Sequence, residues 1–232
     1  MAPGGRMARW QRLKALIFDL DGTLYDDPEL LAEYPRQAVA FVAERLRLPL
    51  DAARERYAGE AQRLRQATGQ SPSTTRVLLA LTGARLDEWA GFLADRVDPS
   101  RFLDPADYQW LRELLSRLRD HYLLAIVSNN NRVLAERILR RLGIRHLFDV
   151  ILTTTESGRI KPDPSLYLEV ADALGVRPEA CLAIGDRLAV DIIPARRAGL
   201  QAVLVRTPQD LRRLGAELLA VAEERQAELR PG

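Results

Sequence analysis

The sequence predicts an α/β protein with a doubly wound, Rossmann-like parallel sheet and one inserted helical domain. Short, continuous apolar segments such as residues 181–185 are typical of strands that are covered on both faces. From residue 105 onward these segments alternate with amphipathic helical patterns, as in sheets built from βαβ units. A long stretch of helical spacing without a convincing strand separates the first apolar segment, residues 14–19, from the others. We therefore expect the sheet to be interrupted by an insertion after its first strand.

Apolar spacing, glycine and proline define the elements of the sheet domain. The expected strands cover residues 14–19, 122–127, 148–153, 181–185 and 202–205. The expected helices cover residues 105–120, 131–142, 164–174, 190–198 and 211–228. Gly143 and Gly199 stand where glycine commonly ends a helix, and Asp163 precedes another helix as a cap. Strand and helix thus alternate through this part of the chain, which indicates helices on both faces of the sheet.

The insertion is expected to be a compact unit of four helices. The amphipathic segments cover residues 30–48, 52–67, 74–81 and 86–97, with proline and glycine between them. Asp27 precedes Pro28 and is expected to cap the first of these helices. The chain then divides into an α/β core domain, residues 1–26 and 101–232, and a helical domain, residues 27–100. Residues 1–12 are expected to form an unstructured tail.

Composition excludes several classes of protein. Lysine and arginine total 34 against 32 acidic residues, and this balance lacks the basic excess typical of nucleic-acid binding. Only Lys14 and Lys161 are lysines, so the other basic residues are arginines, as in proteins of GC-rich genomes. Cys181 is the single cysteine and cannot form an internal disulfide. No apolar segment approaches the roughly 18 residues of a membrane span. We therefore expect a cytoplasmic protein with no nucleic-acid or membrane partner.

Residues able to do chemistry follow four of the predicted strands. In open α/β sheets, ligands bind beyond the carboxyl ends of the strands. The residues expected to meet there are Asp19 and Asp21 after the first strand, Ser128 and Asn129 after the second, Lys161 after the third, and Asp186 and Asp191 after the fourth. Each of these short motifs alone is common in turns and helix caps. Their joint occurrence at successive strand ends predicts a single site.

The charges of these residues indicate what the site binds. Clustered carboxylates repel one another, and a hard cation with oxygen ligands, above all Mg²⁺, is the usual remedy. Mg²⁺ in such sites commonly completes its coordination with water and a substrate phosphate. Lys161 adds a second positive charge, without which a phosphate dianion would be repelled. The sequence therefore predicts Mg²⁺ as cofactor and a phosphorylated substrate.

The motifs resemble those of the haloacid dehalogenase-like hydrolase superfamily. Asp19-Leu20-Asp21-Gly22-Thr23 comes first, Ser128-Asn129 second, Lys161-Pro162 third, and Gly185-Asp186 with Asp191 last. The four motifs occur in this order over nearly the whole chain. A helical insertion between the first and second motifs is similar to that of the C1-capped phosphatases of this superfamily.

The resemblance implies a role for each motif residue. Asp19 would be the nucleophile that forms an aspartyl-phosphate, and Asp21 would be the general acid and then the general base. Ser128 and Asn129 would hold the phosphoryl group, and Lys161 would neutralise charge. The implied metal ligands are Asp19, the backbone carbonyl of Asp21, and Asp186, with Asp191 in the first shell or just behind it. The implied activity is that of a Mg²⁺-dependent phosphatase of a small phosphorylated metabolite, such as a sugar phosphate, phosphoglycolate or a nucleoside monophosphate.

The motifs bear differently on three other enzymatic activities of similar proteins. A phosphomutase of sugar phosphates differs mainly in what the cap positions after the first transfer, so it stays an alternative. A 2-haloacid dehalogenase needs neither metal nor a second carboxylate, which Asp21, Asp186 and Asp191 argue against. Phosphonoacetaldehyde hydrolases need a cap lysine for a Schiff base, and residues 15–160 contain no lysine. A phosphate-binding module without activity would lack Asp19 or Asp21, and both are present.

Several conspicuous residues are better explained as structural. Asn130 is expected to cap the helix that follows, Trp89 to pack among apolar neighbours, and Cys181 to lie in the core. The insertion contains no motif that identifies the substrate, and the chain is expected to be a monomer or a homodimer.

Overall fold

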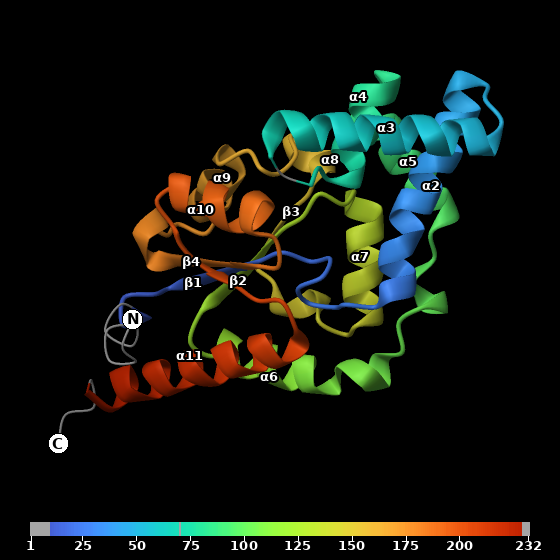
Figure 1. The fold of residues 1–232 in the computed structure, drawn as a ribbon. Helices are drawn as coiled ribbons and strands as arrows, with labels where there is room; N and C mark the ends of the chain where they lie inside the picture. Colours follow the sequence, from blue (N-terminus) through green and yellow to red (C-terminus); the bar gives the residue numbers. More distant parts are fainter. Residues whose placement is uncertain (1–9, 70, 229–232) are drawn as a thin grey trace.

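A computed structural model describes residues 10–69 and 71–228, and its centre is a sheet of five parallel strands (Figure 1). The strands are β1 (Ala15–Phe18), β2 (Leu123–Val127), β3 (Val150–Leu152), β4 (Cys181–Gly185) and β5 (Gln201–Leu204). Their order in the sheet is β3-β2-β1-β4-β5. The predicted parallel sheet is thereby confirmed, with β1 in the middle although the insertion separates it from the other strands in sequence.

The register of the sheet brings the ends of three strands to one level. Phe18, the last residue of β1, is paired with Ile126 of β2 and with Ile184 of β4. The residues that follow these three strands therefore leave the sheet side by side, as parallel strands require. This alignment positions the first, second and fourth sequence motifs next to one another.

Helices cover both faces of the sheet, as predicted for a doubly wound fold (Figure 1). One face packs against α6 (Gln109–Arg119), α7 (Arg132–Arg141) and α11 (Pro208–Glu228), and the other against α9 (Ser165–Ala173) and α10 (Ile193–Arg197). Alternate side chains of a strand point to opposite faces. Phe18 accordingly belongs to the cluster on the first face and Ile17 to the cluster on the second.

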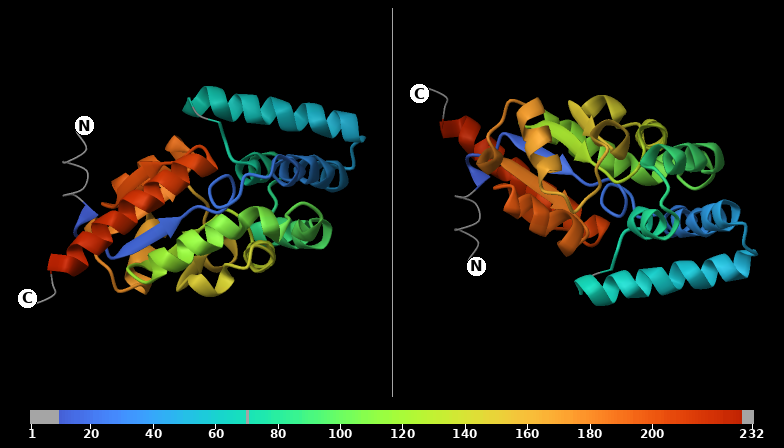
Figure 2. Two further views of the ribbon diagram at one scale, coloured as in Figure 1. Left: turned by 90° about the horizontal axis from the view of Figure 1, so that it is seen from below. Right: turned by 90° about the horizontal axis from the view of Figure 1, so that it is seen from above.

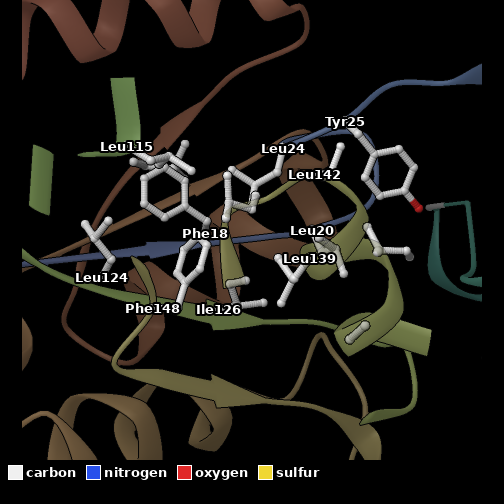
Figure 3. Packing of buried hydrophobic residues seen from close by; sticks show 14 of the residues in the cluster. Phe18, Leu20, Leu24, Tyr25, Leu115, Leu124, Ile126, Leu139, Leu142 and Phe148 are labelled. Atoms are coloured by element: carbon white, nitrogen blue, oxygen red, sulfur yellow. The ribbon is translucent and has the colours of Figure 1, made fainter. Parts of the chain in front are cut away.

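The larger apolar cluster lies on the first face of the sheet (Figure 3). The rings of Phe18 and Phe148 meet edge to face, with their centroids 6.2 Å apart. Leu20 and Leu24, in the loop after β1, belong to the same cluster. Burial of these two leucines anchors the loop that carries the first motif.

The insertion consists of four helices, as the spacing predicts. They are α2 (Pro28–Leu46), α3 (Leu50–Thr68), α4 (Thr74–Thr82) and α5 (Leu86–Arg96). The Asp27 side chain caps α2 by accepting a hydrogen bond from the Leu30 N–H at 2.7 Å, which confirms its expected role. In both views of Figure 2, α3 lies on the outer side of α2 and α4. The whole unit lies beyond the carboxyl ends of the strands (Figure 1).

The structure corrects three local predictions. Trp10, expected in an unstructured tail over residues 1–12, is buried in the main cluster, because its ring adds apolar area to the core. Residues 1–9 of that tail lie outside the described residues. The helix expected from residue 105 begins as a 3₁₀ turn over Pro105–Tyr108, and the helix expected from residue 190 begins as a π-helical turn over Leu188–Ile192. A further short helix, α8 (Thr154–Ser157), was not predicted.

None of the helices within the described ranges has the length and hydropathy needed to cross a bilayer.

Candidate active site

Asp19 leaves the carboxyl end of β1 and points into a buried polar cluster. Its backbone N–H still donates to the carbonyl of Ile184 at 2.8 Å, which continues the pairing of the sheet. Its Oδ1 accepts hydrogen bonds from the Leu20 N–H at 2.7 Å and from the Lys161 Nζ at 2.6 Å. Burial, and then repulsion by Asp191, raise the pKa of Asp19 well above its usual range. A cation beside this carboxylate is therefore needed to keep it ionised.

Lys161 lies between two carboxylates in the interior of the protein. Its Nζ is 2.6 Å from Asp19 Oδ1 and 2.7 Å from Asp191 Oδ1, and only 2% of its surface is exposed. Burial disfavours the ammonium, but the attraction of Asp19 and Asp191 outweighs it and raises the pKa of Lys161. The lysine therefore stays charged and holds the two aspartates together.

One carboxylate oxygen from each of Asp19, Asp186 and Asp191 lies within 4.8 Å of the other two. Lys161 supplies one positive charge against three carboxylates, and the buried Oδ1 of Asp186 has no hydrogen-bond partner among the described residues. Burial and repulsion by Asp191 raise the pKa of Asp186. An unsatisfied buried oxygen and an excess of negative charge both fit a bound cation. The donor set, all oxygen, fits a hard ion.

Gly22 provides the space for this cluster. It has a φ of +81°, which favours glycine, and a Cβ atom at this position would lie 2.7 Å from Asp186 Oδ2. The loop after β1 can therefore approach Asp186 closely only because residue 22 carries no side chain. The positive φ and the close approach to Asp186 thus explain why the first motif has glycine at position 22.

Asp191 holds the fourth motif together. Its Oδ1 accepts from Lys161, and its Oδ2 accepts from the backbone N–H of Arg187 at 3.0 Å. Both carboxylate oxygens are therefore already engaged with the protein. This arrangement favours a place for Asp191 just behind the directly coordinating oxygens.

Asp21 is surrounded by hydrogen-bond donors. Its Oδ1 accepts from the hydroxyl of Tyr25, the hydroxyl of Tyr34 at 2.9 Å and Asn130 Nδ2 at 2.9 Å. Its Oδ2 accepts from Asn130 Nδ2 at 2.9 Å and from the Ser128 hydroxyl at 3.3 Å. Burial raises the pKa of Asp21, although the hydrogen bonds of both tyrosines act in the opposite direction. A raised pKa favours the protonated form of the carboxyl group, which is the form that can donate a proton.

The structure corrects the role expected for Asn130. The residue that caps α7 is Asn131, whose Oδ1 accepts from the Leu134 N–H at 2.9 Å. Asn130 instead points into the site and donates to Asp21. The two asparagines are adjacent in sequence and equally suited to capping. The choice depends on where α7 begins, one residue later than predicted.

Asn129 contacts the loop that carries Lys161. Its Oδ1 accepts from the Lys161 N–H at 2.7 Å, and its Nδ2 donates to the Lys161 carbonyl at 3.3 Å. Both polar groups of the side chain are therefore used to hold the lysine backbone. Ser128, by contrast, points to Asp21.

The site opens into a cavity of about 240 Å³ between the sheet and the inserted helices. Its core side includes Asp19, Asp21, Lys161 and Asp186, and its other side includes residues of α2, α4 and α5. Trp89 of α5 is packed in the core as predicted, with its ring edge to face against Phe41, and it also contributes to this cavity. The cavity joins the predicted catalytic residues to the insertion.

Sequence reasoning did not assign a role to three residues at this site. Tyr25 and Tyr34 contact Asp21, and Arg187 donates from its guanidinium to the Ser71 carbonyl at 2.8 Å, which links the core to the insertion. Tyr25 is four residues beyond Asp21, so its proximity to the motif was the available signal. No pattern in the sequence indicates Tyr34, because its contact depends on how α2 packs against the core.

Comparisons with known proteins cover most of the chain. A family model described as haloacid dehalogenase-like hydrolase matches residues 13–199. The chain is 33% identical over 199 residues to the glyceraldehyde 3-phosphate phosphatase of Methanopyrus kandleri, covering 84% of each chain. It is 31% identical over 208 residues to the N-acetylmuramic acid 6-phosphate phosphatase of Pseudomonas aeruginosa, covering 84% of this chain and 82% of that one. The solved structure of a HAD phosphatase from Thermococcus onnurineus matches with a TM-score of 0.60 and 26% identity, covering 87% of this chain and 97% of that one.

The fold and the site together define a hydrolase. A doubly wound sheet presents carboxylates, a hydroxyl and a buried lysine at its carboxyl edge, over a cavity closed by helices. With the family model matching most of its length, the chain belongs to the haloacid dehalogenase-like hydrolase family. It is a phosphatase, a hydrolase of phosphoric monoesters, as the sequence predicted.

Proposed function

We propose that this phosphatase acts on a short sugar phosphate, requires Mg²⁺, and forms an aspartyl-phosphate on Asp19. The observation that carries the proposal is the contact of Lys161 with Asp19 in the same cavity that Asp21 lines. The Lys161 ammonium lowers the pKa of Asp19 against the effect of burial and so favours its ionised form, which can attack phosphorus. Asp21 has a raised pKa and can supply a proton.

The reaction then has two displacements. Asp19 attacks phosphorus while Asp21 gives its proton to the departing alcohol oxygen, which leaves an acyl phosphate on Asp19 and an ionised Asp21. Asp21 next takes a proton from a water molecule that attacks the same phosphorus, which releases phosphate and restores both residues. Lys161 and the Ser128 hydroxyl lie beside these two carboxylates and offset the negative charge of the phosphoryl group.

Asp19, Asp186 and the backbone carbonyl of Asp21 are the residues that we assign to Mg²⁺. The Oδ1 of Asp186, which has no hydrogen-bond partner within the described part of the chain, and the surplus of carboxylates support this assignment. The cation, when bound, supplies positive charge for the phosphoryl oxygens. Asp191 orients Lys161 and the Arg187 backbone behind these ligands. Asn129, whose amide already holds the Lys161 backbone, would reach a phosphate through its own backbone.

Residues 27–100 are proposed to act as a cap that closes over the substrate and excludes water. Contacts of Tyr34 with Asp21 and of Arg187 with Ser71 join this unit to the core. The location in the cytoplasm and the monomeric or homodimeric state stay predictions of the sequence.

The size and lining of the cavity support a small, hydroxylated substrate. A volume of about 240 Å³ is below the range of roughly 300–1,000 Å³ that is common for ligand pockets. Its lining includes the hydroxyl-bearing residues Ser73, Thr74 and Thr75 and the apolar residues Trp89 and Leu93. A lining of both kinds suits a sugar, which has hydroxyl groups and C–H groups. Several relatives are named as phosphatases of sugar phosphates, in agreement with this substrate class.

The test is a screen of phosphate release with and without Mg²⁺. The substrates are glyceraldehyde 3-phosphate, fructose 1-phosphate, N-acetylmuramic acid 6-phosphate, phosphoglycolate and a nucleoside monophosphate. We expect the short sugar phosphates to be hydrolysed fastest. Preference for the nucleotide would contradict the proposed substrate class, and isomerisation of a hexose phosphate without phosphate release would identify a phosphomutase instead.

Removal of the metal should abolish activity, and Gly22→Ala should raise the Mg²⁺ concentration needed to restore it. The added methyl group would displace the Asp186 carboxylate. Loss of a group that orients a metal ligand commonly costs about 10- to 100-fold in metal affinity, and we expect a change of that order. The measurement is half-saturation by Mg²⁺ after treatment with EDTA.

Gly59→Ala is the matched control for this measurement. Gly59 lies within α3, and a Cβ there would meet no atom within 4 Å. The control should respond to Mg²⁺ like the wild-type protein. An unchanged half-saturation in Gly22→Ala would remove Asp186 from the proposed ligands.

A further inference from the structure

The donors around Asp21 come from two different parts of the protein. Tyr25, Ser128 and Asn130 belong to loops of the core at the ends of β1 and β2. Tyr34 belongs to α2 of the insertion and donates to Asp21 Oδ1 at 2.9 Å. Among the hydrogen bonds that described residues make to this carboxylate, the one from Tyr34 alone crosses from the insertion. The orientation of Asp21 is therefore tied to the position of α2.

The two oxygens of Asp21 are not equivalent. Oδ1 accepts from three donors, of which two are tyrosine hydroxyls and one is Asn130 Nδ2. Oδ2 shares Asn130 Nδ2 and otherwise has only the longer contact, 3.3 Å, with the Ser128 hydroxyl. A carboxylate oxygen has about two acceptor sites, so Oδ1 is saturated. Oδ2 has two donors, one of them at 3.3 Å, so it is the less strongly held oxygen and the one that we assign to proton exchange with the substrate.

The protons of the cluster are consistent with this assignment. Tyr34 has one hydroxyl proton, which it can donate to Asp21, and its oxygen is 3.2 Å from Asn130 Nδ2, which has two protons to donate. Tyr25 can donate its single proton to Asp21 as well. Both tyrosines can therefore donate to Oδ1 at once, in which case no proton lies in the 2.9 Å contact between their hydroxyl oxygens, and Asn130 donates to Tyr34 and to Oδ2. Withdrawal of Tyr34 would leave Oδ1 with one donor fewer and would leave Asn130 without one of its acceptors.

Of the two tyrosines that donate to Asp21 Oδ1, Tyr25 is the one held in place. Figure 3 shows its ring at the end of the main apolar cluster, with the hydroxyl pointing away from the labelled leucines and phenylalanines. Its ring is 2% exposed, so it cannot shift without opening the core. Tyr34 is half-buried at the cavity, on a helix that begins directly after the loop of the first motif. The movable donor is therefore Tyr34.

We propose that Tyr34 is a positioning residue through which the seating of α2 orients Asp21 for proton transfer. This inference rests on the proposed function and deepens it. With α2 seated, Tyr34 and Tyr25 hold Oδ1, and Oδ2 faces the departing oxygen of the substrate. With α2 displaced, Oδ1 loses a donor and the carboxyl group is free to rotate. Protonation of the leaving group is then efficient only when the insertion is closed over the site.

The test compares Tyr34→Phe on two esters. A sugar phosphate has a poor leaving group that needs the proton of Asp21, whereas 2,4-dinitrophenyl phosphate has a leaving group that departs as a stable anion. General acid catalysis contributes about 10²- to 10⁴-fold, and we expect kcat for the sugar phosphate to fall at least about tenfold more than kcat for the dinitrophenyl ester. The ratio of the two losses is the readout, because a merely structural role would lower both alike.

Tyr122→Phe is the matched control. This substitution also removes the hydroxyl of a buried tyrosine. The Tyr122 hydroxyl donates to the Leu218 carbonyl at 3.0 Å, on the face of the sheet that packs against α6 and α11. We expect both esters to be hydrolysed by this variant at wild-type rates. Equal losses on both esters in Tyr34→Phe, or no loss, would overturn the inference while the phosphatase activity stands. Failure of the wild-type protein to hydrolyse either ester would overturn the proposed function itself.

Discussion

Asp19→Asn is expected to lower kcat for phosphate release by about 10⁴-fold or more, the order of loss seen when a catalytic nucleophile is removed. The amide cannot form the acyl phosphate, and the remaining groups of the site cannot supply another carboxylate at the same place. Asp21 is held by tyrosines and asparagine, and Asp191 is held by Lys161 and the Arg187 backbone. The measurement is steady-state phosphate release, combined with mass spectrometry of acid-quenched protein during turnover.

The protein should remain folded in this variant, so the loss can be attributed to chemistry. Burial and repulsion by Asp191 already disfavour a charge on Asp19, and Lys161 keeps Asp191 as its partner. Asp26→Asn is the matched control, because Asp26 is exposed and follows the same loop. We expect a covalent phosphoryl group on the wild-type and control proteins, and none on Asp19→Asn. Substantial turnover by Asp19→Asn would refute Asp19 as the nucleophile.

Much of the fold could be predicted because it depends on local patterns. Side chains of a continuous apolar strand such as residues 181–185 point to both faces of the sheet and are buried only if helices cover both. In the structure they belong to the apolar clusters on both faces. The four inserted helices follow from amphipathic spacing and punctuation by proline and glycine. The buried Trp10 and the π-helical turn at Leu188–Ile192 could not be predicted, because both depend on packing between segments that are distant in the chain.

The site also contains residues that local patterns predict and residues that depend on tertiary packing. Asp19, Ser128 and Asp186 stand at the ends of β1, β2 and β4, and parallel register alone brings such ends together. Tyr34 contacts Asp21 from the second turn of α2, a helix whose docking angle is set by tertiary contacts. Asn130 and Asn131 differ in role because α7 begins at Arg132, a boundary that spacing defines only to within a residue or two.

Lys161→Met is expected to destabilise the protein by about 3–5 kcal/mol and to remove most of its activity. Loss of one partner from a buried ion pair leaves its charge uncompensated, and this is the cost measured in such cases. Here two carboxylates, those of Asp19 and Asp191, would lose the ammonium that lies 2.6 and 2.7 Å from them. The measurement is urea unfolding in the presence of EDTA, followed by the same experiment with saturating Mg²⁺. The added cation should restore part of the stability, because it replaces one positive charge in the cluster.

The chain offers a matched control in its other lysine. Lys14 is exposed and precedes β1, at the end of the sheet opposite to the site. Exposed charges contribute about 0–1 kcal/mol, so Lys14→Met should unfold at nearly the wild-type urea concentration and keep full activity. Similar small effects in both variants would show that the buried lysine is not what holds the carboxylates together. A large effect confined to Lys161 would identify its charge as the link between the stability of this site and its chemistry. The same ammonium offsets the charge of the buried aspartates and favours the ionised form of Asp19 that attacks phosphorus.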